Sequence, residues 1–210
     1  MAGMRTIWSL WQEAVDANRT NPAYLVEEEG GWREVSWAEA NRIVQELANG
    51  LLAMGLRKGD AFGILARNGI EWALFDFALA HIGVVAAPVY PSSTPADSAY
   101  VLEHAHAVGC LVDAELREKI AGIELEHVIE REQLDDLRAL GRGHAVENLD
   151  AVDRACAEIG DDDLYTLIYT SGTTGPAKGC IILNRNYYDM KLQIENRIQA
   201  AVYAVRSGIV

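Results

Sequence analysis

The strongest constraint on the fold is a strand–helix–strand pattern in the middle of the chain. Ala61–Ala66 and Val84–Val89 are short apolar runs typical of buried strands, and Ile70–Ile82 between them is apolar on nearly every side. A helix that is apolar all round must be buried, and a buried helix joining two buried strands is the crossover unit of a parallel sheet. A membrane span is the weaker interpretation of this stretch, because polar residues and a proline interrupt it: Glu71, Asp76, His81 and Pro88.

The same alternation continues on both sides of this unit and predicts an α/β fold, with a largely parallel sheet and helices on both faces. Upstream, we expect a helix over 4–18, a hairpin of Ala23–Glu27 with Trp32–Val35, and a helix opened by a Ser36/Glu39 capping box and ended by Gly55. Downstream, the pattern predicts a helix capped by Thr94, further strands, a polar helical region over 131–160 with a flexible GRG at 141–143, and a helix over Tyr187–Ile198. The further strands are Cys110–Val112, His127–Ile129, Leu164–Tyr169 and Cys180–Leu183.

Composition narrows the class of protein. Eighteen Lys and Arg against thirty-one Asp and Glu give a net charge of −13, which argues against a nucleic-acid or anionic-membrane surface. Cys110, Cys156 and Cys180 are far apart in the sequence, and no signal peptide precedes them. We therefore expect a cytoplasmic protein whose cysteines are buried thiols.

Residues 169–180, YTSGTTGPAKGC, combine hydroxyls, glycines and one lysine directly after an apolar strand. They are not a Walker A loop: counted from Gly172, Ala177 stands where that motif requires glycine, and Gly179 stands where it requires Ser or Thr. A second apolar strand follows, so the segment joins strand to strand and has no helix dipole to draw on. A solvated Gly/Thr turn and a phosphate cradle both fit this composition.

If the segment is a cradle, its own groups must supply the attraction. The hydroxyls would donate hydrogen bonds, the glycines would let backbone N–H groups close on an anion, and the lysine would add a point charge. The candidate phosphate-binding residues are Thr170, Ser171, Gly172, Thr173, Thr174, Gly175, Lys178 and Gly179.

The sequence YTSGTTGPAKG closely resembles the signature loop of the AMP-forming adenylating enzymes: acyl-CoA synthetases, luciferases and peptide-synthetase adenylation domains. Residues 32–90 resemble the N-terminal part of that family, and VYPSSTPADSAYVLEHA (89–105) is similar to its long-chain fatty acyl-CoA synthetase branch. The resemblance implies that a carboxylate attacks the α-phosphate of Mg·ATP to give an acyl-adenylate and pyrophosphate. Coenzyme A then displaces AMP. The resemblance also implies that residues 170–179 hold the β- and γ-phosphates.

Two substitutions and a difference in length separate this chain from the family pattern. Ala177 replaces the usual proline, and Asn184 stands where many members have histidine. Family members are more than twice as long, and their magnesium-supporting glutamate, ribose-binding aspartate and catalytic lysine have no counterpart here. We therefore expect no catalytic residue within this chain. Residues 1–160 would form one α/β subdomain, and 161–210 the phosphate loop and the start of the next.

These differences leave two functional hypotheses. The first is the N-terminal portion of an ATP-dependent fatty acyl-CoA ligase, inactive alone and requiring a second polypeptide that carries the remaining motifs. The alternative is a non-catalytic nucleotide-binding or assembly module, either half of a split enzyme or a gene relic.

Other candidate sites are weaker. His104 and His106 point in different directions on a helix and make a poor metal pair, and His81 fits a hydrogen-bonded core residue. The acidic run Asp161–Asp163 could hold a cation, although a solvated turn explains it better. No metal site is therefore expected.

Overall fold

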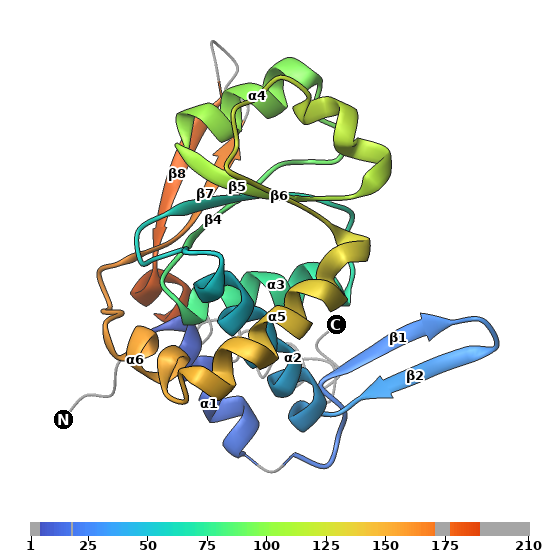
Figure 1. Cartoon of the computed structure of the whole chain (residues 1–210), viewed down its shortest axis with the longest axis vertical. Helices are drawn as coiled ribbons and strands as arrows, with labels where there is room; N and C mark the ends of the chain where they lie inside the picture. The colour runs from blue at the N-terminus through green and yellow to red at the C-terminus, as the bar shows by residue number, and fades with distance from the viewer. Residues whose placement is uncertain (1–4, 18, 171–176, 190–210) are drawn as a thin grey trace, which may run out of the picture.

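A six-stranded sheet organises the computed structural model, which describes residues 5–17, 19–170 and 177–189 (Figure 1). The strand order is β6-β5-β3-β4-β7-β8, and every neighbouring pair is parallel except β7 with β8. The strands are β3 (Ala61–Leu65), β4 (Val85–Pro88), β5 (Ala107–Val112), β6 (His127–Glu130), β7 (Leu164–Thr170) and β8 (Lys178–Leu183). The predicted α/β class with a mostly parallel sheet is confirmed.

Helices cover both faces of the sheet, as the sequence predicts (Figure 1). One face packs against α4 (Pro95–His104) and the 3-10 segment η1 (Ala114–Ile120). The larger core lies on the other face, under α1 (Ile7–Asp16), α2 (Trp37–Ala53), α3 (Ile70–His81), α5 (Leu134–Glu147) and α6 (Ala151–Ala157). A short 3-10 turn, η2 (Arg131–Gln133), precedes α5.

The hairpin β1 (Tyr24–Glu28) and β2 (Gly31–Val35) forms a separate two-stranded sheet that projects from the body of the molecule (Figure 1). The helix after it begins at the predicted cap, where the Ser36 hydroxyl accepts the Glu39 N–H at 3.1 Å. The reciprocal half of the predicted capping box does not form. The Glu39 side chain instead pairs with Arg33 at 3.1 Å, because the hairpin brings that guanidinium within reach.

The GRG segment is not flexible, contrary to the prediction. Residues 141–143 lie inside α5, and Gly141 is buried where α5 crosses α2. A Cβ atom on Gly141 would lie 1.8 Å from the Glu46 carbonyl oxygen, and one on Gly50 would lie 2.4 Å from the Leu137 carbonyl oxygen. Both glycines therefore let the two helix backbones approach more closely than any side chain would permit.

The described residues include no helix that is long and apolar enough to cross a membrane. Burial of α3 explains the apolar stretch, since Phe75, Ala78 and Leu79 are fully buried between the sheet and α2. Cys110 and Cys156 are buried as predicted, but Cys180 is exposed. That exposure follows from the position of β8 at the edge of the sheet, with no further strand beside it among the described residues.

Candidate phosphate-binding site

The candidate phosphate loop spans the turn of the β7–β8 hairpin, so it joins strand to strand as predicted. Thr170 ends β7 and Lys178 begins β8, two residues earlier than the predicted strand start, and the two are register partners. Tyr169 and Gly179 form the next pair. Thr170, Lys178 and Gly179 are thus brought together, whereas five predicted residues lie outside the described part: Ser171, Gly172, Thr173, Thr174 and Gly175.

The hairpin turn lies at the edge of the sheet where the parallel strands end. β7 runs parallel to β4, so Thr170 projects beyond the same edge as Pro88 at the end of β4 and Leu65 at the end of β3. Ligands of open α/β sheets bind outside the carboxyl ends of the strands. The position of the turn therefore fits a ligand-binding loop.

Among the lysines in the described part of the chain, Lys178 alone has an ammonium group with neither a hydrogen-bond nor an ion-pair partner. Lys58 is paired with Asp163 at 2.6 Å, and Lys119 donates to the carbonyl oxygens of Pro91 and Ser93 at 2.5 and 2.8 Å. Lys178 is exposed at the mouth of the hairpin. Its charge is therefore free to attract an anion, in a protein whose net charge is −13.

Helix α4 contacts both ends of the loop. The Tyr100 hydroxyl donates to the Ala177 carbonyl oxygen at 2.9 Å, and the His104 Nδ1 lies 2.8 Å from the Tyr169 hydroxyl. Burial, with a smaller contribution from Tyr100, raises the pKa of Tyr169, so its phenol stays protonated at neutral pH. Gly179 lies under the Tyr169 ring, where a Cβ atom would lie 3.3 Å from the ring carbon Cζ.

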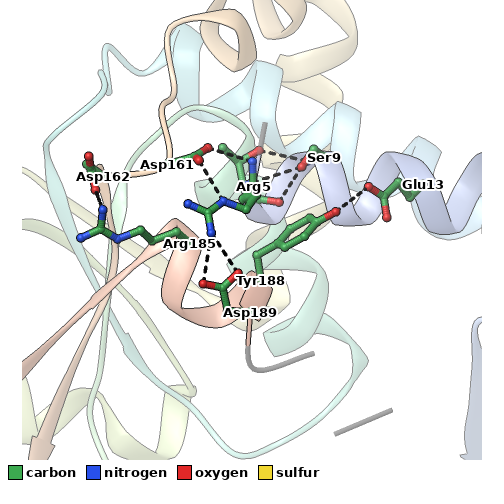
Figure 2. Close-up of polar contacts among 9 residues, drawn as sticks. Arg5, Ser9, Glu13, Asp161, Asp162, Arg185, Tyr188 and Asp189 are labelled. Atoms are coloured by element: carbon green, nitrogen blue, oxygen red, sulfur yellow. Dashed lines mark hydrogen bonds and ion pairs between the residues drawn. The ribbon is translucent and has the colours of Figure 1, made fainter. Parts of the chain in front are cut away.

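The acidic run before β7 is engaged in ion pairs, which neither of the two sequence interpretations anticipated. Asp161 binds the Arg5 backbone N–H and guanidinium at 2.8 and 3.1 Å, Asp162 pairs with Arg185, and Asp163 pairs with Lys58 (Figure 2 shows the first two). Hydrogen bonding from the Arg5 backbone lowers the pKa of Asp161. Each carboxylate already has a cationic partner, so this run is part of the fold.

Asn184 has a structural role that no pattern in the sequence indicated. Its side chain is 3% exposed. Its Oδ1 accepts the Ile7 N–H at 3.0 Å, and its Nδ2 donates to the Asp163 carbonyl at 3.2 Å. The residue thereby attaches Ile7, 177 positions earlier in the sequence, to the strand entry at β7. Only the tertiary contact reveals this function.

Within the described ranges, no group of three or more His, Cys, Asp and Glu side chains converges as metal ligands would. His104 bonds to Tyr169, while His106 lies after α4 in a left-handed conformation with φ of 53°. His81 is a hydrogen-bonded core residue as predicted, with its Nδ1 2.6 Å from the Phe77 carbonyl. Burial lowers its pKa to about 4.

A pocket of 560 Å³ lies away from the β7–β8 hairpin and is lined by residues of β2, α2, α3, η2 and α5. Several arginines and acids around it are paired with one another, as in Arg33–Glu39 and Arg138–Asp135. A smaller pocket of 240 Å³ adjoins the hairpin at the carboxyl edge of the sheet. The smaller pocket is the better placed of the two for a ligand of the candidate loop, because Ile168 and Tyr169 near the end of β7 line it. Its lining is Ala66, Asn68, Trp72, Pro88, Val89, Tyr90, Pro91, Ile168 and Tyr169.

Curated relatives share the sequence at moderate identity. A long-chain-fatty-acid–CoA ligase, FadD15 of Mycobacterium tuberculosis, is 30% identical over 179 residues, which is 80% of this chain and 30% of the relative. A 4-coumarate–CoA ligase-like protein of Oryza sativa is 32% identical over 176 residues, 83% of this chain and 31% of the relative. The chain thus spans about a third of the length of the curated relatives it matches.

Solved structures share the fold. The anthranilate CoA ligase AuaEII matches with a TM-score of 0.74 at 21% identity, over 89% of this chain and 35% of that one. The N-terminal domain of FACL13 from Mycobacterium tuberculosis matches with a TM-score of 0.70 at 21% identity, over 86% and 44% of the two chains. The model of the AMP-binding enzyme family matches residues 11–206, nearly the whole sequence. The chain therefore belongs to the AMP-binding enzyme family.

Proposed function

We propose that this chain is the N-terminal portion of an ATP-dependent, AMP-forming acyl-CoA ligase acting on fatty acids, and that residues 170–179 bind the β- and γ-phosphates of ATP. The observation that carries the proposal is the unpartnered Lys178 ammonium group at the mouth of the β7–β8 hairpin. The family match over residues 11–206 supports the nucleotide. The names of the relatives support a CoA ligase, and FadD15 supports a fatty acid.

In this proposal the protein contributes binding and orientation. Lys178 and the Thr170 hydroxyl face the leaving pyrophosphate, which holds the α-phosphate toward an attacking carboxylate. Mg²⁺ would arrive with ATP, because the described residues offer no cluster of metal ligands and Mg²⁺ is commonly held through substrate phosphates. Coenzyme A would act in the second half-reaction.

The alternative is a module that binds nucleotide or a partner without catalysis. The edge strand β8, which has no further strand beside it among the described residues, favours it, because its Ile181 is 60% exposed. Open sheet edges with apolar side chains are surfaces that other chains pair with. A second polypeptide carrying the remaining family motifs would be the expected partner.

Calorimetric titration with Mg·ATP tests the proposal directly. We expect measurable binding by the purified chain and loss of most of it in Lys178→Ala. The control is Arg154→Ala, which removes the same charge from α6 on the opposite face and should bind like the wild type. Equal affinities for the two variants would refute the phosphate site.

Pyrophosphate exchange separates the two functions. With a fatty acid and ATP, the chain alone should give no exchange, and addition of a polypeptide carrying the later motifs should restore it. If the mixture forms a complex but remains inactive, the non-catalytic module is the correct description.

A further inference from the structure

We propose that Tyr100 and His104 of α4 are positioning residues for the phosphate loop, fixing both of its ends from a single helix. The inference rests on the proposed function, because it matters for binding only if residues 170–179 hold phosphate. It concerns described residues alone: the two side chains of α4, the last residues of β7 and the first residues of β8.

The two hydrogen bonds reach opposite ends of the loop. Tyr100 donates to the carbonyl of Ala177, one residue before Lys178, and His104 bonds the hydroxyl of Tyr169, one residue before Thr170. Tyr100 and His104 are one helical turn apart on α4, so they lie on the same face. A single helix thus holds the residues next to Thr170 and Lys178, which are themselves paired in the β7–β8 ladder.

Aromatic packing reinforces both bonds. The Tyr169 ring meets the Tyr100 and His104 rings edge-on, with centroids 6.4 and 5.6 Å away. The Tyr100 and His104 rings lie 5.4 Å apart. Edge-to-face contacts at these distances are favourable. The Tyr169 ring also covers Gly179, so the first residues of β8 are held from a second side.

The two hydrogen bonds from α4 take the place of the orientation that a phosphate site at a helix N-terminus receives from its own helix. The β7–β8 turn joins two strands, so no helix N-terminus orients its backbone N–H groups. Ala177 also imposes less restriction on its backbone than a proline would. The bond from Tyr100 to the Ala177 carbonyl supplies the missing restriction at that end.

Conservative variants test the idea in the whole 210-residue chain. Tyr100→Phe removes one hydroxyl and keeps the ring, and His104→Phe removes the ring nitrogens. Each should weaken binding of Mg·ATP, and of inorganic tripolyphosphate as a base-free probe, by about fivefold, the affinity equivalent of one net hydrogen bond. His104→Asn places an amide near the position of Nδ1 and should restore most of the affinity.

Tyr188→Phe is the matched control, because it removes a phenol hydrogen bond of 3.1 Å to Glu13, and Tyr188 follows the end of β8 that is farther from the loop. It should leave both affinities unchanged. Affinity loss in this control as large as in Tyr100→Phe would overturn the proposal, since general destabilisation would then explain both. Wild-type affinity in Tyr100→Phe and His104→Phe would overturn it too.

Amide hydrogen exchange without ligand gives a second readout that does not depend on nucleotide binding. In Tyr100→Phe we expect faster exchange at Lys178 and Gly179, with the amides of α2 unchanged. If the wild type binds neither probe, the proposed function fails, and the exchange result alone decides whether α4 positions the hairpin. Unchanged exchange at the hairpin would refute the positioning role.

Discussion

Two glycines of α5 that are separated by a single residue should respond in opposite ways to the same substitution. Gly141 and Gly143 are both helical, so replacing either with alanine gains up to about 1 kcal/mol of helix propensity. A Cβ on Gly143 meets nothing within 4 Å, so that gain is kept. A Cβ on Gly141 would lie 1.8 Å from the Glu46 carbonyl oxygen and 2.7 Å from the Gly50 nitrogen. Both are backbone atoms of α2, so the helices must separate.

Overpacking of this kind costs about 1–3 kcal/mol or more, so Gly141→Ala should lose about 2 kcal/mol net. For a chain of this size that lowers Tm by about 4–8 °C, while Gly143→Ala should raise it by about 2 °C. Thermal and urea unfolding of the two variants beside the wild type would measure the difference. Equal stabilities for the two variants would refute the close crossing of α2 and α5.

The remaining predictions concern buried polar groups. Burial raises the pKa of Asp76 to about 6, above its unfolded value of about 3.9, so the folded state takes up a proton and gains about 3 kcal/mol as pH falls from 6 to 4. Burial lowers the pKa of His81 to about 4 from about 6.5, so stability falls by a similar amount over the same acidification. Urea unfolding should therefore show a weak net pH dependence from this pair in the wild type. In Asp76→Asn only the His81 contribution remains, so the free energy of unfolding should fall between pH 6 and pH 4. In His81→Gln only the Asp76 contribution remains, so it should rise. Parallel profiles for all three proteins would contradict the assignment. Asn184→Ala should lower the free energy of unfolding by about 2 kcal/mol, because it leaves the buried Ile7 N–H unpaired and removes one of the two N–H donors to the Asp163 carbonyl; Asn184→Asp should recover part of this by keeping an acceptor for Ile7.

Local sequence patterns predicted most of the sheet and its helices correctly. The apolar run of α3 between two apolar strands required a crossover, and Thr94 with Pro95 marked the start of α4. These predictions succeeded because burial and helix capping depend on residues within a few positions of each other. The strand-loop-strand setting of residues 164–183 followed from the same reasoning.

Features that depend on distant residues were missed or predicted incorrectly. GRG in α5 has the composition of a flexible turn, and only the approach of α2 makes Gly141 a packing residue. Cys180 has the apolar character of a core thiol but lies on the exposed edge strand. Tyr100 and His104 lie about seventy residues before the loop ends they contact. The division of the chain at residue 160 stays a prediction.

The attachment of the first helix to the last strands has a consequence for synthesis on the ribosome. Trp11 packs against Trp37 and Phe77, which emerge soon after it, so the middle of α1 can dock early. Its first turn must wait, because Ile7 is bonded by Asn184 and Arg5 by Asp161 and Asp189 (Figure 2 shows the Arg5 contacts). Residues 5–7 are thus synthesised early, but their contacts form only after residues 161–189 have been synthesised. A chain released before residue 184 would lack the Asn184 and Asp189 contacts of these residues, which would then be open to proteolysis.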